Sequence, residues 1–175
     1  MNRRLPSERA ALKLLRQAGC SRRVVKHCKA VASLAVEIAE ACKQKGFEVD
    51  VDLVRIGALL HDIGRAKTHG VEHGVVGAQI AKEWNLPKAI VFIIERHVGS
   101  GITEDEAEKL GWDIKSYIPE SLEERVVAYA DKFIEGSLRL PVEVGFERFH
   151  RDKNIPEGSI ERLKEWHREF SICLA

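Results

Sequence analysis

The sequence lacks any run of 18 apolar residues, and its charges nearly cancel, with 28 Lys and Arg against 27 Asp and Glu. A missing apolar run excludes a transmembrane helix, and residues 1–10 hold arginines but no apolar segment of a signal peptide. Because the net charge is close to zero, electrostatic attraction does not favour binding to double-stranded nucleic acid or to an anionic membrane surface. We therefore expect a cytoplasmic protein that recognises its partners at local sites.

Cysteine is also scarce. The four thiols are Cys20, Cys28, Cys42 and Cys173, and no two of them form a C-x-x-C pair. This spacing indicates neither a disulfide framework nor a cysteine zinc site. We expect reduced thiols that serve packing.

What the chain does contain is a series of helical patterns without convincing strand alternation or repeats. Apolar residues at helical spacing, with capping residues before them and glycine or proline after them, predict eight helices. These cover about residues 7–17, 21–46, 50–62, 73–84, 87–97, 103–111, 121–136 and 159–173. Residues 137–158 hold prolines and glycines around one weak amphipathic piece, 142–149, and predict an irregular excursion. The expected fold is an all-α single domain, 1–175, a globular bundle of seven or eight helices.

An adjacent histidine and aspartate end the most apolar of these helices. The run from Val54 to Leu60 is almost uninterrupted, and His61-Asp62 follows it directly. An unpaired buried carboxylate is costly, so this pair needs either a hydrogen-bonding partner or a metal ion.

Other polar residues lie on the apolar faces of further helices. Any single one could be a core residue bonded to a backbone carbonyl, but a whole set of inward histidines and aspartates is satisfied most readily around a cation. The inward set comprises His27, His61, Asp62, His73, His97 and Asp131. Imidazole and carboxylate without thiolate suit manganese, iron, cobalt, nickel or magnesium, with zinc also compatible. We expect one or two divalent ions.

The order His27, His61-Asp62, Asp131 resembles the signature of the HD-domain superfamily of metal-dependent phosphohydrolases. His73 and His97 resemble the additional ligands of the six-ligand subset with a dinuclear centre. The resemblance covers about residues 20–136 as a metal-binding core and leaves 137–175 as a C-terminal helical extension. It implies that His27, His61, Asp62 and Asp131 hold one ion, and that His73 and His97 hold a second with Asp62 bridging.

The resemblance also implies a reaction. A water activated by the metal attacks phosphorus, with Asp62 as its candidate proton acceptor. Four cationic residues close to the proposed metal ligands in the sequence are candidates for binding phosphate oxygens, and each could equally be a solvated surface charge. They are Arg65, Lys67, Arg96 and Lys132. His69 is a candidate proton donor, an alternative ligand or a surface residue.

Three function classes stay open. The first is a phosphohydrolase or phosphodiesterase acting on a small nucleotide or related phosphate ester. The second is a diiron oxygenase on the same scaffold, and the third is a regulatory domain that binds a nucleotide without turnover. The subset that the chain resembles includes cyclic-nucleotide and cyclic-dinucleotide phosphodiesterases, diadenosine tetraphosphate hydrolases and diiron oxygenases. The sequence leaves open whether the protein forms a homo-oligomer.

Overall fold

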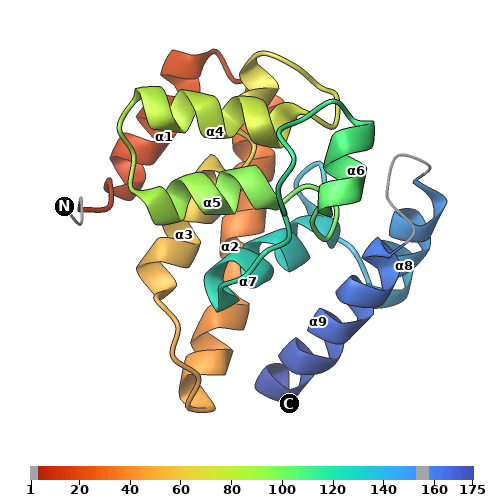
Figure 1. Cartoon of the computed structure of the whole chain (residues 1–175). Helices are drawn as coiled ribbons and strands as arrows, with labels where there is room; N and C mark the ends of the chain where they lie inside the picture. Colours follow the sequence, from red (N-terminus) through yellow and green to blue (C-terminus); the bar gives the residue numbers. More distant parts are fainter. Residues whose placement is uncertain (1–3, 153–157) are drawn as a thin grey trace.

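The computed structural model describes residues 4–152 and 158–175, and helices make up most of that part (Figure 1). The elements in chain order are α1 (Glu8–Ala18), α2 (Arg22–Gln44), α3 (Val51–Leu60), the 3-10 helix η1 (Ile63–Ala66), α4 (His73–Glu83), α5 (Lys88–Arg96), α6 (Glu104–Lys109), α7 (Leu122–Lys132), β1 (Ile134–Glu135), β2 (Leu138–Arg139), α8 (Val142–Arg151) and α9 (Ser159–Leu174). The all-α single-domain prediction is confirmed, with nine α-helices in this part instead of seven or eight. No helix among these residues has the length and apolarity that a membrane span requires.

Local capping explains where several helices begin. Thr103 and Glu106 form a capping box at the start of α6, in which each side chain binds the backbone N–H of the other residue. The corresponding box at the start of α7 is only half formed. The Ser121 hydroxyl accepts from the Glu124 N–H, but the Glu124 carboxylate turns away and pairs with Arg96.

The core is organised around α2, which packs against α3, α7 and α9. In α3 every residue from Ile56 to Leu60 is buried. Full burial of each aliphatic side chain contributes about 1.5–3 kcal/mol. This burial draws the two residues that follow into the interior, so that His61 is 0% exposed and Asp62 is 7% exposed.

Glycines allow η1 to lie directly on α4. A Cβ on Gly64 would overlap the carbonyl oxygen of His73, and it would lie 2.7 Å from the Gly77 nitrogen. Only glycine permits backbones to approach this closely. The contact holds Asp62, immediately before η1, beside His73, the first residue of α4.

The segment after α7 differs from the sequence prediction. A helix is predicted to Gly136, but α7 ends at Lys132 and a hairpin of β1 and β2 follows, with Gly136 in its turn at φ 60°. Glycine adopts such a φ without the steric cost of a Cβ. The expected irregular excursion contains β2 and the regular helix α8, while residues 153–157 lie outside the described residues.

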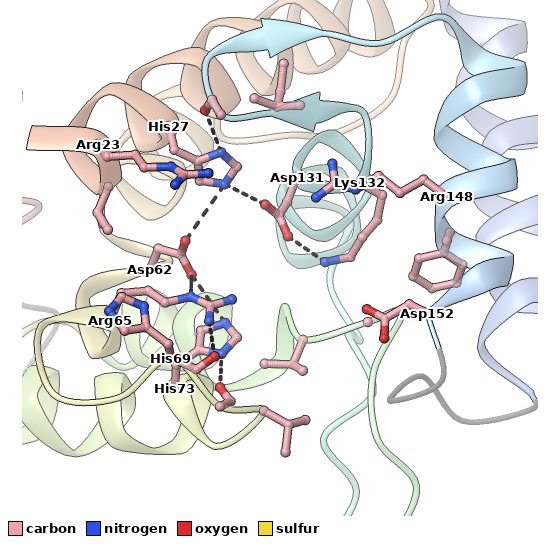
Figure 2. A pocket seen from close by; sticks show the side chains of 18 of the residues that line it. Arg23, His27, Asp62, Arg65, His69, His73, Asp131, Lys132, Arg148 and Asp152 are labelled. Atoms are coloured by element: carbon pink, nitrogen blue, oxygen red, sulfur yellow. Dashed lines mark hydrogen bonds and ion pairs between the residues drawn. The ribbon is translucent and has the colours of Figure 1, made fainter. Parts of the chain in front are cut away.

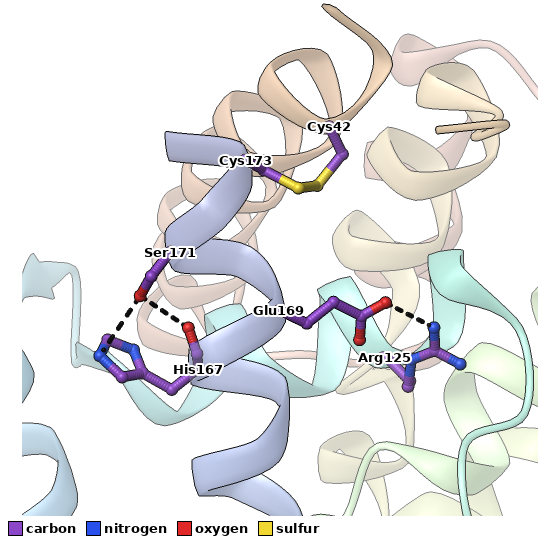
Figure 3. The surroundings of a disulfide bond; sticks show 6 residues. All are labelled: Cys42, Arg125, His167, Glu169, Ser171 and Cys173. Carbon is purple, nitrogen blue, oxygen red and sulfur yellow. Dashed lines mark hydrogen bonds and ion pairs between the residues drawn. A yellow bond between two sulfur atoms is a disulfide. The ribbon is translucent and has the colours of Figure 1, made fainter. Parts of the chain in front are cut away.

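The prediction that all four thiols are reduced is wrong. Cys42 on α2 and Cys173 on α9 form a disulfide, with their Cα atoms 4.7 Å apart (Figure 3). The partners are 131 residues apart in the chain, so spacing gives no sign of them. Cys20 and Cys28 are free. Disulfides occur in oxidising compartments and also inside the cells of hyperthermophiles, so this bond does not decide the compartment.

Candidate metal centre

Three side chains from three helices meet beside a pocket, which two of them, His27 and Asp131, line. His27 lies on α2, His61 directly follows α3, and Asp131 lies on α7. The Nε2 atoms of His27 and His61 lie 2.8 Å and 3.4 Å from the same Asp131 oxygen, Oδ1. These residues sit on the stripes that their helices bury, so packing of the helices brings the polar groups together.

Asp62 connects this group with His73 and His97. Its Oδ2 lies 3.8 Å from the Nε2 atoms of both His27 and His61. Its Oδ1 lies 3.2 Å from His73 Nε2 and 3.5 Å from His97 Nε2. Figure 2 shows the Asp62 carboxylate between His27 and His73. The structure therefore brings all six predicted ligand residues together, with the two oxygens of Asp62 facing different histidines.

The four imidazoles share one hydrogen-bonding arrangement. In each ring Nδ1 donates to a backbone carbonyl, because a carbonyl oxygen can only accept. The acceptors are Gly136 for His27 at 3.0 Å, Ala58 for His61, Gly70 for His73 and Ile94 for His97, the last three at 2.7 Å. Such bonds fix the ring orientation and leave the Nε2 lone pair of a neutral imidazole for a metal.

One buried atom tests whether a cation fits here. His61 Nε2 is buried and has no hydrogen-bond partner within the described residues. An unsatisfied buried nitrogen is costly, and coordination by a divalent ion would satisfy it. Two groups of ligand atoms lie close enough together to share an ion, namely His27 with His61 and Asp131, and His61 with Asp62 and His97. The donor set fits a divalent metal.

The charge states also suit a cation. Burial alone raises the pKa of Asp62, but the surrounding imidazoles of His61, His73 and His97 outweigh it and hold that pKa well below its usual range. For Asp131, burial is likewise outweighed, chiefly by the adjacent Lys132 ammonium, and its pKa is well below the usual range. Burial lowers the pKa of His97 to about 3. The carboxylates are therefore ionised and His97 is neutral at pH 7, as metal binding requires.

A cavity of about 680 Å³ opens above these residues. This volume lies within the range of about 300–1,000 Å³ that is usual for small-molecule sites. Its walls come from the start of α2, the segment between η1 and α4, the end of α7, the hairpin and α8. Gly99, just after α5, also lines it. The site can accommodate a ligand much larger than one phosphate group.

The predicted phosphate-binding cations do not all reach this pocket. Arg65 and Lys132 line it, and so does His69. Arg65 Nε donates to Asp62 Oδ1 at 3.3 Å, and Lys132 Nζ donates to Asp131 Oδ2. Lys67 is exposed and lies outside the lining. Arg96 is buried elsewhere, against Glu124 at 3.0 Å and over the Phe92 ring, so its predicted phosphate contact is not supported by its position.

Sequence reasoning missed two cations that do line the pocket. Arg23 precedes His27 by four residues, so helical spacing alone places it on the same face and could have identified it. Arg148 comes from α8, within the segment expected to be irregular. No local signal places Arg148 near the metal ligands, because its position depends on how α8 packs.

Two relatives match most of this chain in sequence. A Methanocaldococcus jannaschii protein, named uncharacterized protein MJ0778, is 48% identical over 153 residues, 87% of this chain and 90% of that protein. A tRNA (cytidine(56)-2'-O)-methyltransferase of Thermoplasma volcanium is 40% identical over 170 residues, which are 97% of this chain and 48% of that protein. The chain thus spans about half the length of this second relative.

A solved structure has the same fold. The HD domain of the L. monocytogenes phosphodiesterase PgpH, in complex with cyclic-di-AMP, superposes with a TM-score of 0.56 over 93% of this chain and 96% of that chain, at 18% identity. Residues 24–135, more than half of the chain, match the model of the HD domain family. The resemblance drawn from the ligand order is thereby confirmed, and the chain belongs to the HD domain family.

Proposed function

We propose that this protein is a metal-dependent phosphohydrolase that cleaves a phosphate ester of a nucleotide. The observation that carries the proposal is the convergence of four imidazole Nε2 atoms and two ionised carboxylates beside one pocket, which His27, Asp62, His73 and Asp131 line. Membership of the HD domain family supports it, and so does the cyclic dinucleotide bound to the PgpH neighbour. The expected metal is manganese, iron, cobalt, nickel or magnesium, with zinc also compatible.

The six ligand residues would divide between two ions. His27, His61, Asp131 and Asp62 Oδ2 would hold the first, and His73, His97 and Asp62 Oδ1 the second. Bound there, divalent ions lower the pKa of a water for attack on phosphorus and neutralise charge on the phosphate. Asp62 is the candidate acceptor for the proton of that water.

Two cations of the chain keep the carboxylates in place. Arg65 donates to Asp62 and Lys132 donates to Asp131, and these contacts orient both carboxylates. Their remaining N–H groups are the nearest donors for a phosphate oxygen. His69 is exposed at the pocket, where it is the candidate proton donor to the leaving oxygen.

The proposal is tested by hydrolysis of a nucleotide panel. Protein stripped of metal is resupplied with manganese, iron, cobalt, nickel, magnesium or zinc, and each form is assayed on monophosphates, 2′,3′- and 3′,5′-cyclic nucleotides, linear dinucleotides and dinucleoside polyphosphates. We expect metal-dependent product release from one of these classes. An Asp62→Asn variant at equal concentration controls for contaminating hydrolases.

Two other results would contradict it. Bound iron with oxygen uptake and no phosphate product would indicate the diiron oxygenase. Nucleotide affinity without turnover under every metal would indicate a regulatory domain. The two further arginines at the pocket favour a phosphate-bearing ligand over a neutral oxygenase substrate.

A further inference from the structure

Two arginines face each other across the pocket, outside the metal ligands. Arg23 comes from the first turn of α2, and Arg148 comes from α8 on the opposite wall. Figure 2 shows both side chains extending toward the ligand residues, Arg23 from the side of His27 and Arg148 from the side of Asp131. Both lie outside residues 24–135, the part matched by the family model.

The two arginines differ from the cations nearer the metal ligands in how they are paired. Arg65 and Lys132 are each bound to a ligand carboxylate. Arg23 is exposed and has no ion pair or hydrogen bond within the described residues. Arg148 has one long contact, 3.8 Å from Nε to Glu135 Oε1, between side chains that are more than half exposed. Such a pair contributes little and leaves the guanidinium available.

The charge of the lining also points to an anionic ligand. The cationic side chains of the pocket are Arg23, Arg65, Lys132 and Arg148, and the carboxylates are Asp62, Asp131 and Asp152. Asp62 and Asp131 are already committed to the metal centre and its cations. Arg23 and Arg148 are the two cations of the lining that no ligand carboxylate holds, so the outer pocket favours negative charge.

We propose that Arg23 and Arg148 bind a second phosphate of the substrate, beside the one that is cleaved. The proposal rests on the proposed function and names its substrate class: linear nucleotides that carry at least two phosphates. Arg65 and Lys132 already serve the cleaved phosphate, and a cavity of about 680 Å³ has room for more than one nucleotide unit. A guanidinium presents paired N–H donors that match two phosphate oxygens, which an ammonium does not.

Binding of matched dinucleotides tests this without requiring turnover. Three linear probes with 3′–5′ phosphorothioate linkages are compared. The first is a dinucleoside of two adenosines joined by one linkage, the second is the same molecule with an added 5′-phosphate, and the third has three adenosines joined by two linkages. The dissociation constants are measured by calorimetry on the manganese-loaded protein. We expect each probe with two phosphates to bind about tenfold more tightly than the probe with one, a gain typical of a charge-assisted contact. The second probe offers the second phosphate as a terminal monoester, and the third offers it as an internal diester, so the two sources of that phosphate are measured separately.

Glutamine variants assign the preference to these side chains. Arg23→Gln and Arg148→Gln should each reduce the preference for two phosphates severalfold, and raising the salt from about 50 to about 300 mM should reduce it as well. Arg22→Gln and Arg151→Gln are the matched controls, because both residues lie on the same helices outside the pocket lining. These controls should keep the wild-type preference.

Equal affinity for one and two phosphates would overturn the inference, and so would a preference that survives in both Arg23→Gln and Arg148→Gln. These failures are distinct from failure of the proposed function. Metal-dependent hydrolysis without any preference would leave the proposed function standing. A preference lost in the variants, in a protein that hydrolyses nothing in the panel, would establish the phosphate site and reject the enzyme.

Discussion

The Nε2 atoms of His73 and His97 lie 2.9 Å apart, although both rings already donate from Nδ1 to a backbone carbonyl. Two neutral imidazoles in this state would direct lone pairs at each other, which is repulsive. A proton on His97 would relieve the contact, but burial depresses the pKa of His97 to about 3. A divalent cation between the two nitrogens would relieve this repulsion without a proton. The close approach of His73 and His97 therefore supports a second ion at this pair.

Replacing His97 should remove one ion selectively. His97→Ala takes a nitrogen from the group that faces Asp62 Oδ1 and leaves His27, His61 and Asp131 intact. We expect the bound metal, measured by mass spectrometry after dialysis, to fall from about two ions per chain to about one. His69→Ala, at the exposed rim, is the control and should retain the wild-type metal content. An unchanged content in His97→Ala would indicate a mononuclear site.

Replacing Asp62 should remove both metal retention and hydrolysis. Its two oxygens face four imidazoles, so Asp62→Ala takes a ligand from both proposed ion sites. Loss of a bridging ligand typically costs several orders of magnitude in turnover, about 10³-fold or more. Metal content and initial rates are measured together with the far-ultraviolet circular dichroism, which should stay helical. Full activity in this variant would remove Asp62 from the mechanism.

The contact between η1 and α4 offers a test by steric overlap. Gly64→Ala places a Cβ against the carbonyl oxygen of His73, so the two elements must separate. We expect a loss of about 1–3 kcal/mol in the free energy of unfolding. Metal affinity should fall too, because Asp62 and His73 move apart. Gly46→Ala is the control: its φ of 90° is costly for alanine, but nothing lies within 4 Å of the added Cβ, so stability should fall without loss of metal.

The sequence was sufficient to predict the fold class and the six residues that converge, because both depend on local patterns. His27 and Asp131 lie on apolar helix stripes, and His61-Asp62 ends the most apolar helix, so their inward positions follow from periodicity. Arg96 directly precedes His97 in the chain, but its guanidinium pairs with Glu124, which lies 28 residues further along. A cationic residue that is close in sequence to a proposed metal ligand can thus form its ion pair away from the site.

The features that were not predicted depend on the packing of distant segments. The disulfide joins residues 131 apart, and Arg148 reaches the pocket only because the hairpin and α8 return to the end of α7. Turn residues in 137–158 correctly indicated that α7 could not simply continue. They did not indicate where the next helix would pack, since that is decided by tertiary contacts.

The disulfide should contribute substantially to stability. Because it closes a loop of 131 residues, it restricts the unfolded chain, and Cys173→Ser should lower the free energy of unfolding by about 2–5 kcal/mol. Urea denaturation of both proteins measures the difference. A reductant should lower the transition midpoint of the wild type and leave that of Cys173→Ser unchanged. If reductant does not change the unfolding midpoint of the wild type, the disulfide is not present.

The free thiol of Cys20 should be unreactive near neutral pH. Burial, with a further contribution from the Asp62 charge, raises its pKa from 9.0 to about 11. At pH 8 its thiolate fraction is then about 100-fold below that of an ordinary thiol, and alkylation by iodoacetamide should accelerate about tenfold per pH unit up to pH 11. The native fold holds the proton that the unfolded chain releases above pH 9, so this group should lower stability as pH rises from about 9 to 11. Peptide mapping after timed alkylation measures the rate, with urea-unfolded protein as the control. Equal rates in native and unfolded protein at pH 8 would show that Cys20 keeps an ordinary pKa.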